Sequence, residues 1–307
     1  MPSALITGIR GFVGSHLSAQ LLQRGWQVYG FDHRSGDGTN IFTGDIADRA
    51  AFRNALDECK PNFLIHLAGL IKSTQPEELY YANVFGTVTL LESLLESGQR
   101  PVVIVASSSA VYGSGFGSRP ISERFKPRPV THYAVSKLVQ EIAALHYFDA
   151  FQLPVLVVRM FNLLGPGQSP DLACSTFARQ IAMAEGNGGD EIVTGELNAQ
   201  RDFVDVRDAV RAFALLAEHG KGGQIYNVCS GHAVLVRKCL DDMLSMSLRQ
   251  LRVRVDAERV QKNDVPIQVG NAQKLTRATG WHPQIALRRS LSDLLEYWRQ
   301  RVKSGLE

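Results

Sequence analysis

Tyr133 and Lys137 are residues with acid–base chemistry that lie four positions apart, as a YxxxK motif. On a helix, this spacing places both side chains on one face. An ammonium group beside a phenol stabilises the phenolate and lowers the tyrosine pKa, so the phenol can exchange a proton with an alcohol oxygen near neutral pH. Because YxxxK is common by chance, its weight depends on its surroundings in the fold.

Three hydroxyl residues, at 107–109, lie upstream of this motif. They follow the apolar run 102–106, which predicts a buried strand, and the pattern at 134–151 predicts the helix that carries YxxxK. Open parallel sheets bind their ligands at the carboxyl ends of the strands. We therefore expect the hydroxyls and the YxxxK motif to meet at that edge.

A glycine-rich turn of the form GxxGxxG follows the first predicted strand, 4–6, and opens the predicted helix 13–23. Its glycines permit a tight turn and a close approach to a diphosphate, which the amides of the helix N-terminus then hold. The residues predicted to bind a dinucleotide here are Gly8, Gly11, Phe12, Val13 and Gly14.

Asp32 ends the second predicted strand, 27–31, 18 residues after Gly14. A carboxylate at this place accepts hydrogen bonds from the adenosine ribose and favours NAD. Arg34 could pair with a ribose phosphate, which keeps NADP as an alternative, or it could be a solvent-exposed loop arginine. The other residues predicted to line the coenzyme site are Asp45, Ile46, Leu67, Ala68, Gly69 and Asn83, with a helical surface position as the alternative for Asn83.

Short apolar runs alternate with helical patterns throughout the first half, which predicts an α/β fold with a doubly wound parallel sheet of Rossmann type. After residue 161, Gly and Pro clusters break this rhythm, and 203–218 again has a helical pattern. We expect a dinucleotide-binding domain of residues 1–161, rejoined by 203–229. Residues 162–202 and 230–307 would form a smaller, discontinuous mixed α/β substrate domain.

The composition is that of an ordinary globular protein. Of 307 residues, 45% are hydrophobic and 21% charged, and the net charge of +3 gives no footprint for nucleic acid. No apolar run approaches the ~20 residues of a membrane span, and the start has no basic n-region, so we expect neither a membrane segment nor an export signal. Four cysteines without CxxC spacing predict reduced, buried thiols, no metal site and a cytoplasmic protein.

The motifs together resemble the extended short-chain dehydrogenases/reductases, over nearly the whole chain. In family order, the chain has GxxGxxG, HLAG at 66–69, SSSAVYG at 107–113, YxxxK, FN at 161–162, GPGQ at 165–168, RDFVDVRD at 201–208, YNV at 226–228 and TGWHP at 279–283. This group contains nucleotide-sugar epimerases, dehydratases and 4-ketoreductases. The resemblance implies an NAD(P)-dependent enzyme that acts on a nucleotide-diphosphate sugar.

The resemblance also implies roles for individual residues. Tyr133 would be the acid/base and would also contact the coenzyme. Lys137 would lower the Tyr133 pKa and bind the nicotinamide ribose, and Ser108 would bind the reacting sugar oxygen. Ser107 and Ser109 are the alternatives to Ser108, and are expected to be hydrogen-bonding residues at the strand end. The positions implied to bind the substrate are Ser108, Ser109, Asn162, Gln168, Arg201 and Asp264.

Dehydratases of this group carry an acid pair directly after the catalytic hydroxyl residue, where this chain has Ser109 and Ala110. Neither can donate or accept the proton of an elimination at neutral pH, which disfavours a 4,6-dehydratase. The runs 161–169, 177–182, 201–206 and 226–231 resemble GDP-6-deoxy-D-mannose reductases, which implies reduction of GDP-4-keto-6-deoxy-D-mannose to GDP-D-rhamnose. The alternatives are an NAD-dependent UDP-sugar 4-epimerase and a non-catalytic dinucleotide-binding regulator.

Two departures from the family pattern stand out. Gln261 replaces a phosphate-pairing arginine, for which Arg259 or Lys262 would have to substitute, and His132 replaces the proline that commonly precedes the tyrosine. The helices predicted at 80–96 and 133–151 carry apolar stripes. In the family, the corresponding pair packs against its symmetry mate as a four-helix bundle, so we expect a two-fold homodimer.

Overall fold

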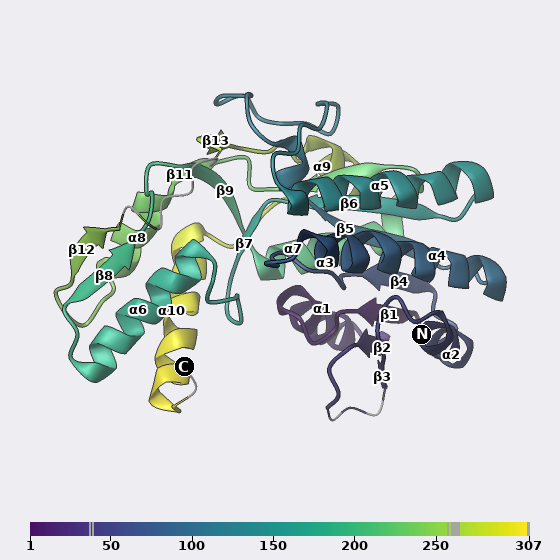
Figure 1. Cartoon of the computed structure of the whole chain (residues 1–307), viewed down its shortest axis with the longest axis horizontal. Helices are drawn as coiled ribbons and strands as arrows, with labels where there is room; N and C mark the ends of the chain where they lie inside the picture. Colours follow the sequence, from purple (N-terminus) through teal and green to yellow (C-terminus); the bar gives the residue numbers. More distant parts are fainter. Residues whose placement is uncertain (37, 39, 257, 259–264, 306–307) are drawn as a thin grey trace.

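A seven-stranded parallel sheet forms the larger part of the molecule, on the right of Figure 1. The computed structural model describes residues 1–36, 38, 40–256, 258 and 265–305. In spatial order, the strands are β10 (Ile225–Val228), β6 (Val155–Met160), β5 (Val102–Ser108), β4 (Phe63–His66), β1 (Ser3–Thr7), β2 (Gln27–Asp32) and β3 (Ile41–Thr43). All their pairings are parallel, which confirms the predicted fold class.

Helices cover both faces of this sheet. One face carries α1 (Phe12–Gln23), α7 (Val206–His219) and α9 (Gln273–Thr279), and the other α2 (Arg49–Cys59), α4 (Gly86–Ser97) and α5 (His132–Phe151). Along β1, Ala4 and Ile6 belong to the core under α1 and α7, while Leu5 belongs to the core under α2 and α4. Strands buried on both faces need apolar residues at every position, which explains the continuous hydrophobic runs of the sequence.

The helix predicted over 80–96 forms as three consecutive segments. α3 (Pro76–Tyr80) leads into a π-helical turn, η1 (Tyr81–Phe85), which continues as α4. A π-turn inserts extra backbone into a helix and often marks a functional position. Here it carries Asn83, which is fully buried.

The smaller part of the molecule lies on the left of Figure 1. It contains a sheet of β7 (Asn162–Leu164), β9 (Gln200–Asp205), β11 (Ala233–Leu235) and β13 (Ile267–Gln268), and a ribbon of β8 (Glu191–Thr194) and β12 (Arg252–Val255). The helices α6 (Ala173–Asn187), α8 (Val236–Leu244) and α10 (Leu287–Lys303) share a core around Phe177, Leu240 and Trp298. The prediction of helix at 203–205 was wrong, because these residues pair with β7 as the end of β9, and α7 begins at Val206.

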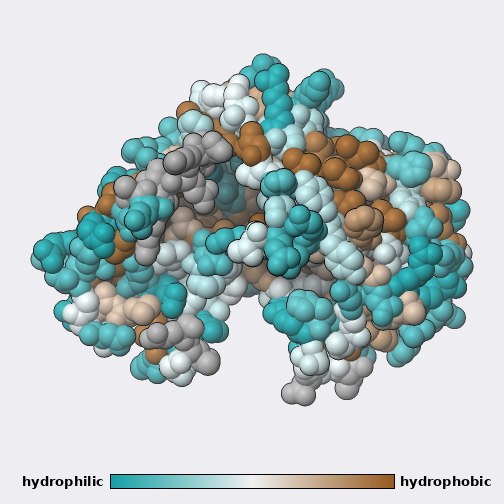
Figure 2. All heavy atoms as spheres, in the orientation of Figure 1, coloured by the Kyte–Doolittle hydropathy of each residue, from teal (hydrophilic) through white to brown (hydrophobic). Residues whose placement is uncertain are grey.

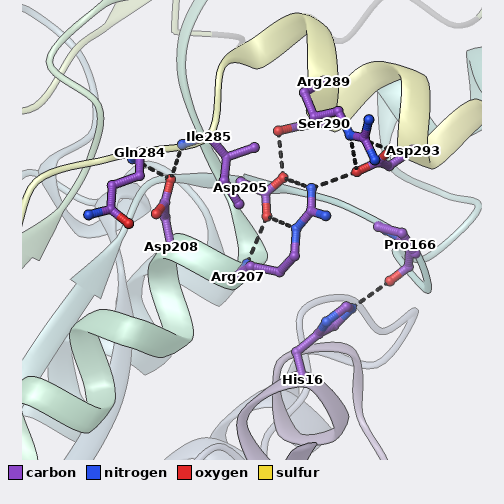
Figure 3. A network of polar contacts seen from close by, with 10 residues as sticks. All are labelled: His16, Pro166, Asp205, Arg207, Asp208, Gln284, Ile285, Arg289, Ser290 and Asp293. Atoms are coloured by element: carbon purple, nitrogen blue, oxygen red, sulfur yellow. Dashed lines mark hydrogen bonds and ion pairs between the residues drawn. The ribbon is translucent and has the colours of Figure 1, made fainter. Parts of the chain in front are cut away.

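Asp205 links the two parts where β9 passes into α7 (Figure 3). Its carboxylate caps α7 through the Arg207 N–H and accepts a hydrogen bond of 2.6 Å from Ser290 on α10. Arg207 pairs with Asp205 at 2.7 Å and with Asp293 of α10 at 2.8 Å. One carboxylate therefore fixes the first turn of α7 and the C-terminal helix together.

The part of the chain after residue 230 is not confined to the smaller lobe. α9 and the buried Trp281 pack against the core of the parallel sheet, although the expected division assigns them to the substrate domain. The four cysteines are buried and unpaired, in agreement with the sequence prediction. Among the described residues, no helix has both the length and the apolar character needed to cross a membrane.

Candidate active site

The glycine turn after β1 packs against the end of β4. Gly8 has a left-handed backbone (φ 69°), and a Cβ atom there would lie 2.9 Å from the Ala68 backbone nitrogen. A Cβ atom on Gly14 would lie 2.3 Å from the Gly8 carbonyl oxygen. The close approach therefore requires glycine at both positions. Gly11 is the N-cap of α1, so the amides of the first helical turn face the glycine turn.

A cavity of about 530 Å³ opens beside this turn, at the carboxyl ends of β1, β2 and β4. Of the residues predicted to bind the coenzyme, those that line it are Gly8, Gly11, Asp32, Arg34, Asp45, Ile46, Leu67, Ala68 and Gly69. One pocket thus combines a turn that admits only glycine with a buried carboxylate. This combination fits the diphosphate and the adenosine ribose of a dinucleotide. A wider hollow of about 750 Å³ beside β12 contains none of the predicted site residues.

Asp32 is buried at the end of β2, and its carboxylate is held from two sides. It accepts hydrogen bonds from the Arg10 backbone N–H at 3.0 Å and from the backbone and side chain of Arg34. Burial alone would raise the pKa of Asp32, but the hydrogen bonds from Arg34 and Arg10 outweigh it, so the pKa is lowered. The carboxylate therefore stays ionised at neutral pH.

Asn83 is neither a surface residue nor among the residues that line the coenzyme cavity. Its amide bonds both backbone groups of Leu70 and donates to Ser136 of α5 at 2.9 Å. The residue thus ties the loop after β4, which lines the cavity, to the helix that carries YxxxK. The alternative of a surface position is therefore wrong, and the predicted contact of Asn83 with the coenzyme stays a prediction.

Ser108 lies at the end of β5, where its hydroxyl oxygen caps the short helix η2 (Ser109–Tyr112) by accepting from the Ala110 N–H at 3.1 Å. An oxygen that already accepts this bond has its own proton free to donate elsewhere. That hydroxyl interacts with the Tyr133 phenol. The Ser108 hydroxyl and the Tyr133 phenol therefore lie together at the carboxyl end of β5.

Tyr133 and Lys137 occupy the first two turns of α5, which Thr131 caps through the Ala134 N–H. Burial raises the pKa of Tyr133, and the contact with Ser108 offsets this only in part. A lysine beside a tyrosine is expected to lower the tyrosine pKa. The residues of the chain do not by themselves produce this lower pKa at Tyr133. Burial also lowers the pKa of Lys137 to about 8, against the opposing effect of the Glu141 carboxylate.

Ser107 and Ser109 are both hydrogen-bonding residues at the strand end, as predicted. Ser107 donates to Glu141 of α5. Ser109 donates to the Gln268 amide oxygen at 2.9 Å, and the Gln268 amide returns a bond of 3.0 Å to the Ser109 carbonyl. Gln268 is thus a residue of the site that the sequence did not reveal, because its partner is 159 positions away.

Two of the positions implied to bind the substrate lie on strands of the smaller sheet. Asn162, on β7, donates to the Asp202 carbonyl, and Arg201, on β9, lies beside Gln268 in the strand register and donates to the Val265 carbonyl. Gln168 is buried, and its amide donates to the carbonyl of Leu163 on β7, which precedes its loop. Asp264, Gln261, Arg259 and Lys262 lie outside the described residues.

His132 opens α5 as an exposed residue beside Tyr133. Its Nδ1 lies 3.1 Å from the Tyr80 hydroxyl, and the two rings meet edge to face. The imidazole therefore links α5 to α3 in the place where the family pattern has proline.

The dinucleotide cavity lies at the end of β4, and the tyrosine–serine hydroxyl pair lies at the end of the neighbouring strand β5, with a buried lysine one turn along α5. Together they define an NAD(P)-dependent oxidoreductase of the short-chain dehydrogenase/reductase type. The chain belongs to the NAD dependent epimerase/dehydratase family, which it matches over residues 4–229. It is therefore an enzyme of the extended class, and its coenzyme is NAD or NADP.

Similar proteins cover both ketoreductases and epimerases. The chain is 32% identical to GDP-6-deoxy-D-mannose reductase of Pseudomonas aeruginosa, over 97% of each chain. It is 30% identical to UDP-glucose 4-epimerase of Mycolicibacterium smegmatis, over 97% of this chain and 98% of that one. The solved structure of RMD from Pseudomonas aeruginosa complexed with NADPH is 31% identical, with a TM-score of 0.88, and covers 98% of this chain and 100% of its own.

Proposed function

We propose that the chain is a nucleotide-sugar 4-ketoreductase that converts GDP-4-keto-6-deoxy-D-mannose to GDP-D-rhamnose. The observation that carries this proposal is the intact Ser108–Tyr133 pair next to Ser109 and Ala110, where an elimination would need acids. Ser109 is a neutral hydroxyl that is buried and bonded to Gln268, so it cannot serve as the acid or base of an elimination. The similarity to GDP-6-deoxy-D-mannose reductase over 97% of both chains supports the sugar and the base.

In the proposed reaction the bound coenzyme supplies a hydride to carbon 4 of the keto-sugar. The residues of the chain bind and protonate the oxygen at that carbon. Ser108 donates a hydrogen bond to it, since its own oxygen is occupied by the Ala110 N–H. Tyr133 gives its phenolic proton to the same oxygen as negative charge develops there. The ketone becomes an alcohol, and Tyr133 regains its proton from solvent.

A UDP-sugar 4-epimerase is the second candidate, because the same serine, tyrosine and lysine serve both reactions. The relative named UDP-glucose 4-epimerase matches 97% of this chain at 30% identity, close to the value for the reductase. An epimerase would first oxidise carbon 4 and then return the hydride to the other face of the sugar. Its coenzyme would be regenerated in each cycle instead of consumed.

The deciding experiment mixes the purified protein with GDP-4-keto-6-deoxy-D-mannose and a small excess of NADH or NADPH. We expect reduced-nicotinamide absorbance to fall in proportion to the keto-sugar, and the product to have the D-rhamnose configuration by NMR. Tyr133→Phe serves as the inactive control. If neither coenzyme is consumed while UDP-glucose and UDP-galactose interconvert without added coenzyme, the epimerase assignment replaces the reductase.

We also propose that the enzyme is a homodimer, and its four buried thiols support a reducing compartment such as the cytoplasm. Figure 2 shows apolar residues gathered on the face of the larger lobe over the region of α5. The large exposed apolar side chains of η1 and α5 are Tyr81, Phe85, Val139, Ile142 and Phe151. Two copies of this face would form the four-helix bundle.

Sedimentation velocity tests the dimer at micromolar concentration. We expect the wild type to sediment as a dimer and Ile142→Arg as a monomer, because an arginine would be buried without a partner at the interface. Leu22→Arg, at an exposed position of α1, is the control and should remain dimeric. A monomeric wild type would overturn the proposal.

A further inference from the structure

A buried ion pair lies beneath the catalytic helix and is not used by the proposed mechanism. Arg159, on β6, meets the Glu141 carboxylate of α5 through its Nε at 2.9 Å and its Nη2 at 2.6 Å. Both side chains are almost completely inaccessible to solvent, at 3% and 2% exposure. A buried pair contributes little net stability compared with apolar residues of similar size, so its presence calls for another reason.

Glu141 lies on the same helix as the two YxxxK residues, at intervals of four. Tyr133, Lys137 and Glu141 therefore follow one another along one face of α5, and the last two are buried. Ser107 on β5 donates to the Glu141 carboxylate and is the register partner of Arg159 on β6. Two neighbouring strands thus hold the carboxylate at a fixed place, one helical turn from the Lys137 ammonium.

We propose that Glu141 is a positioning residue whose fixed carboxylate keeps the Lys137 side chain charged and seated at the coenzyme site. This inference rests on the proposed role of Lys137 in holding the nicotinamide ribose. Arg159 serves it by binding both oxygens of the carboxylate, which prevents the carboxylate from turning away. The ion pair therefore acts on the site through Lys137 and does not touch substrate.

The charges around Lys137 agree with this assignment. Burial disfavours its ammonium form, and Glu141 is the group that opposes burial. His66, from β4, is neutral because burial and the nearby Lys137 lower its pKa to about 3, and burial keeps Tyr133 protonated. Arg159 lies beyond the carboxylate, with its guanidinium 4.7 Å from the Tyr112 ring centroid. Among the described residues on these elements, Glu141 is thus the anion that supports Lys137.

Burial and the Glu141 carboxylate have opposite effects on the pKa of Lys137, and the result decides its charge at physiological pH. With a pKa of about 8, roughly nine in ten Lys137 side chains are charged at pH 7, whereas a pKa one unit lower would leave about half. Since a neutral amine gives up most of its attraction for the ribose and the phenolate, the carboxylate sets the upper pH at which the site works.

The test measures the charge of Lys137 directly. The chain has nine lysines, so ¹³Cε-lysine labelling gives few NMR signals, and the signal that Lys137→Met removes is that of Lys137. In the protein without coenzyme, we expect this signal to titrate about one pH unit lower in Glu141→Gln than in the wild type. Ser107→Ala, which removes a hydrogen bond from the same cluster and keeps both charges, should titrate like the wild type.

A second variant keeps the test decisive if Glu141→Gln fails to fold because Arg159 is left unpaired. Glu141→Gln/Arg159→Met removes the pair together, and its Lys137 signal should still move downward, by less than in the single variant. The affinity for NADH should weaken as the pH rises, and in this variant the weakening should begin at a correspondingly lower pH than in the wild type. Neither measurement uses a sugar substrate, so both stand even if the reductase assignment fails. If either variant that lacks the Glu141 charge folds and its Lys137 signal titrates as in the wild type, the inference is overturned.

Discussion

Arg34 donates two hydrogen bonds to a single oxygen of Asp32, from its backbone N–H at 3.1 Å and from its Nε at 3.2 Å. The Asp32 side chain is buried, whereas that of Arg34 is about half exposed, at 51%. Both line the coenzyme cavity. One place in the pocket thus combines an acceptor for ribose hydroxyls with a cation for a ribose phosphate, and we expect the protein to bind both NADH and NADPH.

Removing the guanidinium should change the choice between these coenzymes. We expect Arg34→Ala to weaken NADPH binding by roughly tenfold, the value of one charge-assisted contact to phosphate. NADH binding should stay within about twofold, because Asp32 keeps the Arg10 N–H. Fluorescence titration measures both dissociation constants, with Arg53→Ala on α2 as a control. Equal losses for the two coenzymes would mean that Arg34 supports only the pocket shape.

Tyr133→Phe should abolish turnover without disturbing the fold. Removing a positioned acid typically lowers the rate by about 10² to 10⁴. The Ser108→Ala loss should be smaller, because Tyr133 can still protonate the oxygen. Coenzyme affinity should be close to that of the wild type in both variants. Steady-state rates test this prediction, with Tyr80→Phe on α3 as the matched tyrosine control. A Tyr133→Phe enzyme with more than a tenth of wild-type activity would contradict the assigned role.

Lys137→Met should stabilise the coenzyme-free protein while it impairs function. The pKa of Lys137 falls from 10.5 in the unfolded chain to about 8 in the fold, so burying the ammonium costs up to about 3 kcal/mol at neutral pH. The folded state binds fewer protons between pH 8 and 10.5, so wild-type stability rises with pH across that window. The gain from the substitution should therefore be greatest below pH 8 and vanish above 10.5. Urea unfolding at several pH values measures it, and a destabilised variant at pH 7 would refute it.

Acid should destabilise the protein through His66. Its ring bonds Thr7 and Thr87 at 2.8 Å, and burial lowers its pKa from 6.5 to about 3. The unfolded chain therefore binds the additional proton between these values, and stability falls as pH drops from 6.5 toward 3, by up to about 1.4 kcal/mol per unit. In His66→Gln this part of the slope should disappear. Thermal unfolding across this range would decide, and an equal slope in both proteins would exclude His66 as the cause.

The dinucleotide half of the molecule was readable from the sequence because its signals are local. The glycine turn at Gly8 and the carboxylate of Asp32 each lie at the end of a buried strand. Tyr133 and Lys137 lie on one helix. In β1, Leu5 faces one helical layer and its neighbours face the other, so the strand appears as an unbroken apolar run. The confirmed fold class follows from that pattern.

The smaller lobe was harder to predict because its strands are short and pair over long distances. β7 and β11 have three residues and β13 two, too few for an alternating pattern. Residues 203–205 continue the helical pattern of α7, yet pairing with β7 holds them as strand. Asn83 and Gln268 depend on a π-turn and on a partner 159 residues away, and neither leaves a local signature.

The position of β10 at the outer edge of the large sheet has a consequence for how the protein is made. The outer neighbour of β6 is β10, although residues 161–224 are synthesised between them. Until β10 has left the ribosome, the backbone groups along one side of β6 stay open to pairing with other chains. The half that carries Tyr133 and Lys137 thus cannot complete its sheet alone. The segment between β6 and β10 must be synthesised first, so the folding of the larger lobe is coupled to the synthesis of the smaller one.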